Sequence, residues 1–129
     1  MNHCGICRAC CRAPEISELQ KPEWKMCQHA CATGCGIYES RPQSCRDYRC
    51  IWLQSQGGPG ALPSRLRPDR CGVIFDQPDG LENTGLIVAR AAPGQEEKLR
   101  GSAVAAFVTE LKRVGFRIVT RVGGDWGLA

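Results

Sequence analysis

The sequence has few aromatic residues and no long apolar run. Aromatic side chains make up 6% of the 129 residues, so a folded core would have to rely on aliphatic side chains. No stretch approaches the roughly 20 apolar residues that a membrane-spanning helix needs, so we expect no membrane segment. Only two histidines are present, both close to cysteines, and a Ser/His/Asp catalytic set is therefore not indicated.

A secretory signal is not evident either. Residues 1–5 hold no charged segment followed by an apolar run. We therefore expect a cytoplasmic protein whose thiols stay reduced. The net charge of +4 is too small to indicate nucleic-acid binding by itself, and the arginines scattered over residues 65–90 are typical of a solubilising surface.

Cysteine, in contrast, is abundant: the chain has ten, and nine of them lie in the first 50 residues. Such a density suits a disulfide scaffold in a secreted chain or a metal site in a reducing compartment, and the missing signal favours metal. The first cluster, at residues 4–11, reads C-x-x-C-x-x-C-C. A C-x-x-C turn lets two sulfurs converge on one ion, and C-x-x-C-x-x-C is a ligand spacing of iron–sulfur sites.

Further cysteines follow in recognisable segments. These are G-C-G-I-Y at 34–38, R-P-Q-S-C-R at 41–46 and Y-R-C-I-W at 48–52. Together with the first cluster they resemble the CxxCxxCC cysteine-cluster family of zinc- or iron-chelating proteins, over residues 4–52. The same module is similar to a region of flagellin lysine methylases. One position departs from the commonest family form, because Arg8 follows Cys7 where that form has glycine.

The resemblance implies a set of eight cysteine ligands. Six match the general family pattern and two match one branch of it: Cys4, Cys7, Cys10, Cys11, Cys35 and Cys45, then Cys27 and Cys50. Eight thiolates could form two four-thiolate sites or one polynuclear cluster with spare thiols. Cys31 and His29 are further candidates, although a free thiol and a surface histidine are the simpler interpretations.

All-cysteine ligation suits an iron–sulfur cluster, zinc or copper(I). The first cluster favours an iron–sulfur cluster, with zinc close behind and copper third. The leading hypothesis is a metal-binding or redox accessory module, whose partner would be a protein and neither nucleic acid nor a membrane. One alternative is a cluster- or metal-dependent group-transfer enzyme, by analogy with the methylases, and another is a structural-zinc adaptor for protein interaction. A non-enzymatic role is favoured, since no G-x-G-x-x-G loop follows a predicted strand.

The chain changes character after the cysteines. Residues 1–54 form the expected metal-binding lobe, residues 55–70 a connector rich in glycine and proline, and residues 71–129 a more regular unit. The lobe shows little apolar periodicity, so metal binding would supply its folding free energy, on the order of 10 kcal/mol for a thiolate zinc site. The unit at 71–129 is expected to pack with the lobe as one compact protein.

Residues 71–129 carry the pattern of strands and a helix. Apolar runs at 71–76 and 85–90 predict two strands, and alternation over 116–122 predicts a third. The apolar spacing from Leu99 through Phe107 and Leu111 to Val114 predicts a helix that packs on the sheet. Cys71, at the start of the first strand, is expected to be a small buried hydrophobe. The tail at 123–129 shows no pattern. We therefore expect an α+β protein, with an irregular cysteine-rich lobe followed by a small antiparallel β-β-α-β unit.

Overall fold

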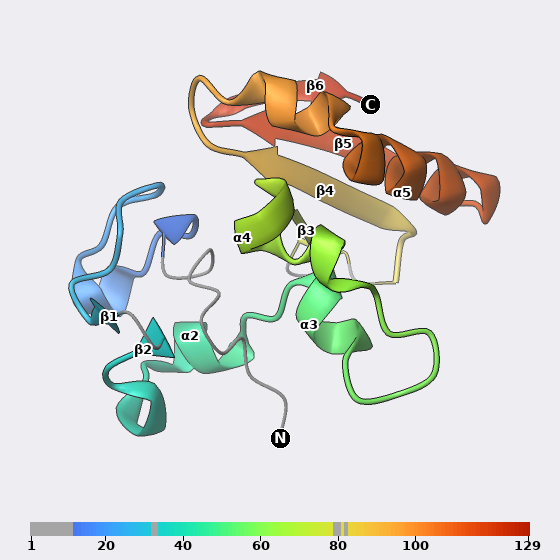
Figure 1. Ribbon diagram of the computed structural model, residues 1–129. Coiled ribbons are helices and arrows are strands. Elements are labelled where there is room, and N and C mark those ends of the chain that lie inside the picture. Colours follow the sequence, from blue (N-terminus) through green and yellow to red (C-terminus); the bar gives the residue numbers. More distant parts are fainter. Residues whose placement is uncertain (1–11, 32–33, 79–80, 82) are drawn as a thin grey trace.

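The computed structural model describes residues 12–31, 34–78, 81 and 83–129. Figure 1 shows a twisted sheet with one long helix beside it, and an irregular lobe at the other side of the molecule. No helix in the described part of the chain is long and apolar enough to cross a membrane.

A mixed sheet of four strands forms the C-terminal half. Its order is β3 (Ile74–Asp76), β4 (Leu86–Ala91), β5 (Arg117–Val122) and β6 (Asp125–Leu128). The β3–β4 and β5–β6 pairs are antiparallel, whereas β4 and β5 are parallel. The α+β class and the β-β-α-β order are thus confirmed.

Two features of the sheet differ from the expectation. The antiparallel arrangement is wrong for β4 and β5, because α5 (Ser102–Arg113) carries the chain back along the sheet before β5 begins. Two strands joined through such a helical crossover run in the same direction. The tail is also part of the fold, since β6 pairs with β5 after a turn at Gly123, whose φ is +60°.

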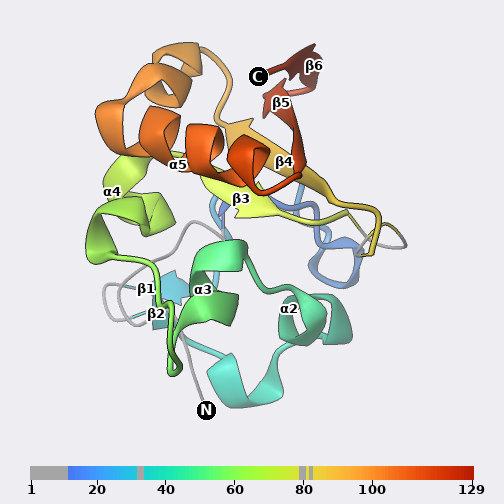
Figure 2. The ribbon, with the colours of Figure 1, turned by 90° about the vertical axis from the view of Figure 1, so that its right-hand side faces the viewer.

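Helix α5 covers one face of the sheet (Figure 2). The core between them contains two residues of α5 together with residues of the strands and of the turn before β3: Val104 and Leu111, then Val73, Phe75, Ile87, Ala89 and Ile118. The Phe107 ring packs edge-on against Phe75, with the ring centroids 5.0 Å apart. The predicted placement of Phe107 and Leu111 on the sheet is therefore confirmed.

The ends of the predicted helix lie outside α5. Leu99 belongs to the separate 3₁₀ turn η4 (Glu96–Arg100), although its side chain still packs against the core. Val114 is exposed, because α5 stops at Arg113 and the chain then turns toward β5 at Gly115, whose φ is +106°.

The other helices and strands of the described residues are short. In order they are η1 (Ser17–Leu19), β1 (Ala30–Cys31), β2 (Gly34–Cys35), η2 (Tyr38–Ser40), α2 (Gln43–Asp47), α3 (Ile51–Ser55), η3 (Ser64–Leu66) and α4 (Pro68–Cys71). The predicted connector at 55–70 contains η3 and all of α4 except Cys71. Cys71 therefore ends a helical turn and does not open a strand, because Gly72, with φ +78°, terminates α4 before β3 begins.

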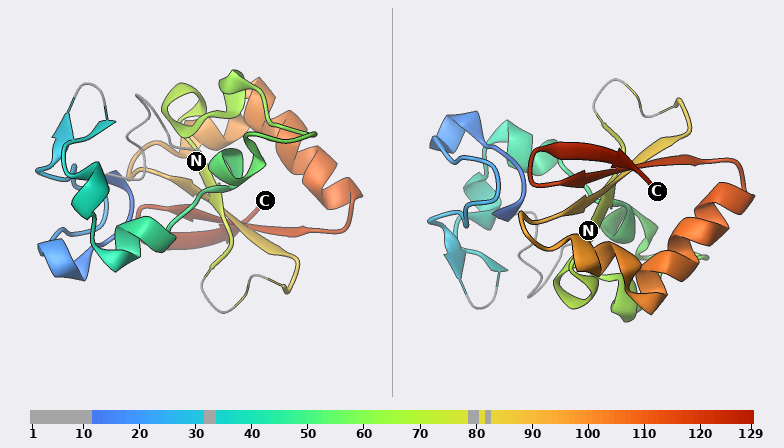
Figure 3. Two further views of the ribbon diagram at one scale, coloured as in Figure 1. Left: turned by 90° about the horizontal axis from the view of Figure 1, so that it is seen from below. Right: turned by 90° about the horizontal axis from the view of Figure 1, so that it is seen from above.

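A second apolar cluster joins the lobe to the sheet. It contains Ala13, Cys50, Leu53 and Ile74. Ile74 precedes Phe75 in β3, so its side chain points to the face opposite α5. The two views in Figure 3 place the β1–β2 hairpin at the end of the molecule away from the C-terminal end of α5.

Candidate metal centre

In the described part of the cysteine-rich lobe, few side chains are buried. Between residues 22 and 49 none of the described side chains is fully buried, although Trp24 and Tyr48 pack against the second apolar cluster. The backbone of this stretch nevertheless forms a hairpin and two short helical turns. Apolar burial, the usual source of stability, therefore contributes little here.

Cys27 precedes strand β1, and Cys35 lies in β2. Ala30 pairs with Cys35, and the Gly36 amide donates to the His29 carbonyl at 2.7 Å. A Cβ atom on Gly36 would approach that carbonyl oxygen to 3.0 Å, so the glycine permits the close contact. The backbone N–H of His29 donates to Cys27 Sγ at 3.4 Å.

Cys45 lies on α2, which is tied to the segment after the first cysteine cluster. Glu18 of η1 accepts hydrogen bonds from the Ser44 backbone N–H at 3.2 Å and from its hydroxyl at 2.8 Å. The hydrogen bond from the Ser44 hydroxyl is the main reason why the pKa of Glu18 is lowered. The contact fixes the start of α2 relative to residues 17–19.

Cys50 is buried where the lobe meets the sheet, at the N-terminal end of α3. A polar contact lies beside it. The Tyr48 hydroxyl donates to Asp76 Oδ2 at 2.9 Å, and Arg90 Nε donates to the same oxygen at 2.7 Å. Burial, and next the charge of Asp76, raise the pKa of Tyr48, so its hydroxyl remains a donor.

Lys21 organises the chain that follows the first cysteine cluster. Its ammonium donates to the carbonyl oxygens of Arg12 at 2.9 Å and Pro22 at 3.1 Å, and also to that of Pro14. The residue is only 6% exposed, and this burial of a charge is offset by the carbonyl contacts. Sequence patterns gave no indication of this role or of those of Glu18 and Asp76.

The described residues do not complete a metal site. Four predicted ligands, Cys4, Cys7, Cys10 and Cys11, lie outside them. Among the residues that the structure does describe, no three His, Cys, Asp or Glu side chains form a group that could hold a metal ion. Cys31 pairs through its backbone with Gly34, and the His29 ring lies beside Gln28, with 3.4 Å between their Nε2 atoms.

Cys71 differs from the cysteines of the lobe. Its thiol packs against the core and donates to the carbonyl oxygens of Val73 at 3.3 Å and Leu66 at 3.6 Å. Burial raises its pKa. Since a metal ligand must be a thiolate, these surroundings favour a neutral structural thiol.

Comparison with known proteins gives no match, either to a family model, to a curated protein or to a solved structure. The resemblance to the CxxCxxCC cysteine-cluster family remains a prediction that rests on residues 4–52.

Proposed function

We propose that this chain is a metal-binding protein that holds an iron–sulfur cluster or zinc through the cysteine thiolates of its lobe. The observation that carries the proposal is a folded backbone with no fully buried side chain between residues 22 and 49, among those that the structure describes. Small domains that cannot bury enough apolar surface are commonly stabilised by disulfides or metals. The cysteine density of the same stretch supplies suitable ligands.

The chemistry of the donors supports a soft metal. Cys27, Cys35 and Cys45 are partly exposed, so their sulfur atoms are not committed to an apolar core. A four-thiolate centre built on them would need at least one further thiol, which residues 4–11 can supply. The sulfur of Cys27 also accepts a hydrogen bond from the backbone N–H of His29, a contact that sulfur ligands of metal sites commonly receive. When bound, the metal would cross-link the lobe, and an iron–sulfur cluster would also carry electrons.

The net charge of the lobe also suits a thiolate metal centre. Residues 1–54 contain seven basic and five acidic side chains. Zinc with four thiolates has a net charge of about −2, which would offset this local excess. Arg41 precedes Cys45 on the segment between the hairpin and α2 and is partly buried. Guanidinium groups close to thiolates would stabilise them further.

Metal content of cysteine variants tests the proposal. The chain would be purified without oxygen, and its metal content and visible spectrum measured. We expect Cys27→Ser, Cys35→Ser and Cys45→Ser to lower the metal bound per chain, because a hydroxyl is a harder and much less acidic ligand than a thiol. A coloured, reducible preparation would identify an iron–sulfur cluster, and a colourless one with stoichiometric zinc a zinc site.

Cys71→Ser is the matched control, since it makes the same change outside the lobe. It should leave the metal content unchanged. If Cys71→Ser lost metal while the three lobe variants kept it, the proposed centre would be wrong.

A further inference from the structure

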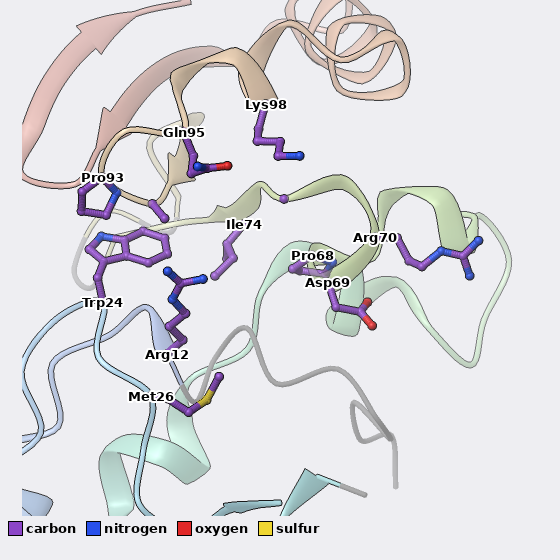
Figure 4. Close-up of a pocket in the computed structure, with 12 residues that line it drawn as sticks. Arg12, Trp24, Met26, Pro68, Asp69, Arg70, Ile74, Pro93, Gln95 and Lys98 are labelled. Carbon is purple, nitrogen blue, oxygen red and sulfur yellow. The ribbon is translucent and has the colours of Figure 1, made fainter. Parts of the chain in front are cut away.

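The two edges of the four-stranded sheet differ in how they are covered. Strand β3 forms one edge, and all of its residues are buried. Side chains from other parts of the chain surround it, and Figure 4 shows Trp24 of the lobe and Pro68 of α4 near Ile74. Strand β6 forms the other edge, at the outer margin of the molecule, and all of its residues are exposed (Figure 1). In the described part of the chain, β6 pairs with β5 alone.

The outer edge of β6 presents backbone groups that do not pair with β5. The Ala129 N–H donates to the Ile118 carbonyl at 3.4 Å, which makes these two residues a hydrogen-bonded pair of the antiparallel β5–β6 ladder. Such pairs alternate along a ladder with pairs that exchange no hydrogen bond, and the pairs containing Trp126 and Leu128 are of this second kind. The N–H and C=O groups of Trp126 and Leu128 therefore point away from β5, where another strand can pair with them.

The same two residues carry large apolar side chains. Trp126 is 58% exposed and Leu128 is 88% exposed. Because they lie two positions apart in the strand, both project from one face of the sheet. The Arg121 guanidinium lies over the Trp126 ring, 4.8 Å from its centroid, and helps to hold the ring in place. Edge strands are commonly protected by charged residues or proline, and neither occurs at these two outward-facing positions.

An antiparallel pairing of β6 with its own copy matches these features. A two-fold axis at Gly127 would place Trp126 opposite Leu128 of the second copy, and Leu128 opposite its Trp126. Each pair would exchange two backbone hydrogen bonds, because all four residues point their N–H and C=O groups outward. Side chains that lie directly opposite share a face, so each tryptophan would contact a leucine. A register shifted by two residues would place one of the two beyond strand β6 of the second copy.

The charges around β6 support the same register. The axis at Gly127 would place Asp125 opposite Ala129 of the second copy, on the face that Ile118 buries against α5. Lys112 of α5 donates to the Ala129 carbonyl, so its ammonium lies at that position. Within one chain Asp125 and Ala129 are about 13 Å apart along the strand. Across the axis, Asp125 of each copy would meet Lys112 of the other.

Both members of this contact are available for it. Among the described residues, neither Asp125 nor Lys112 forms a side-chain ion pair within its own chain. Two such contacts, related by the axis, would flank the apolar pairs. A surface that is complementary to itself in this way favours a two-fold dimer.

We propose that the chain associates with a second copy of itself through β6, so that the two sheets join into one. Two short strands bury little area, and interfaces below about 1,200 Å² belong to the weak, transient class. Strand β6 contains no cysteine, so the dimer forms independently of the proposed metal centre.

Sedimentation velocity of the full chain, with its metal as purified, tests the proposal. We expect the average mass to rise from monomer toward dimer between about 5 and 500 μM, as a weak interface requires. A monomer over the whole range would leave the edge to a strand of another protein and would overturn the proposal.

Variants of Leu128 test the edge itself. Leu128→Pro removes an outward-pointing N–H and none of the hydrogen bonds to β5, so it should abolish association while circular dichroism shows the fold unchanged. Leu128→Ala should weaken association by about tenfold, because each dimer loses the apolar contact twice. Val114→Ala shortens another exposed apolar side chain, outside β6, and should have no effect. Equal effects of Leu128→Ala and Val114→Ala would contradict the assignment to this edge.

Charge reversal tests the register. Asp125→Lys and Lys112→Glu each replace both attractive contacts between the copies by repulsive ones, and each should weaken association by about tenfold or more. Mixing the two variants in equal amounts restores both attractive contacts in the mixed dimer, so association should return. A defect in folding would not be reversed by mixing. Association of either variant at the original strength, or a mixture that stays monomeric, would refute the pairing.

Discussion

Replacing Asp76 by alanine tests how the lobe is joined to the sheet. Asp76 is 4% exposed, and its Oδ2 accepts hydrogen bonds from Tyr48 and Arg90. Tyr48 belongs to the segment between Cys45 and Cys50, whereas Arg90 lies on β4. The carboxylate therefore connects two parts of the chain that are far apart in sequence.

The expected loss of unfolding free energy depends on the groups that Asp76→Ala leaves without their partner. Removing one partner of a buried ion pair commonly costs about 3–5 kcal/mol, because the other charge stays partly buried. The Arg90 side chain is 20% exposed and can regain some hydration. Oδ1 of Asp76 is buried without a partner among the described residues, which already reduces the net value of the pair. We therefore expect a loss near the lower limit, about 3 kcal/mol.

Two more conservative substitutions show how much each contact contributes to this loss of unfolding free energy. Asp76→Asn keeps one oxygen acceptor but removes the charge, and should cost about 1.5 kcal/mol. Tyr48→Phe removes only the hydroxyl that donates to Asp76 and should cost about 1 kcal/mol. Because the two residues share a hydrogen bond, Tyr48→Phe combined with Asp76→Ala should cost about 1 kcal/mol less than the sum of the single losses.

Urea unfolding of the metal-loaded chain, followed by circular dichroism, measures these free energies. Asp125→Ala is the control, since Asp125 lies exposed on β6. Surface substitutions of this kind usually change the free energy of unfolding by no more than about 0.5 kcal/mol. A loss for Asp76→Ala that is equal to the control, or strict additivity with Tyr48→Phe, would refute the proposed connection.

Three further predictions concern the two halves separately. Removing metal with a chelator should abolish amide-exchange protection at residues 22–49 but not in the sheet, and unchanged protection of the lobe would contradict its dependence on metal. Phe107→Ala should lower the free energy of unfolding by about 3 kcal/mol, because it deletes the ring packed on Phe75, whereas the exposed Val114→Ala should have little effect. Lys21→Met should cost about 3 kcal/mol by leaving backbone carbonyls without their donor, and a loss as small as that of the control Lys25→Met would disprove this role.

The regular half of the fold could be predicted from the sequence because its apolar periodicity is local. Helix α5 buries one face, which leaves a helical repeat, whereas β3 and β4 are buried on both faces and appear in the sequence as short apolar runs. Strand direction leaves no such pattern, so the parallel pairing of β4 and β5 had to come from the crossover rule. Strand β6 was hidden for another reason: Trp126 and Leu128 are 58% and 88% exposed, and an edge strand with no buried face has no alternation to detect.

The lobe was less predictable because its contacts join distant residues. The cysteine spacings are local, and they alone indicated a metal site. The bond between Glu18 and Ser44 spans 26 residues and that between Tyr48 and Asp76 spans 28. Which side chains meet over such separations depends on the fold and leaves no local pattern in the sequence. Each of these residues also has an ordinary interpretation, as a surface charge or as an aromatic ring of the core.

The free energies that these polar contacts and the proposed metal would contribute differ in size, and this difference assigns them different roles. Glu23 lies 3.5 Å from Arg121, which gives the lobe another contact with the sheet. Partly exposed pairs of this kind contribute about 1 kcal/mol or less each. A few such contacts together supply only a few kcal/mol. A thiolate zinc site contributes on the order of 10 kcal/mol. The polar contacts therefore set where the lobe lies on the sheet, whereas the metal would stabilise its interior. Because they hold the edges of the lobe close to its final position, they also reduce the entropy that metal binding has to overcome.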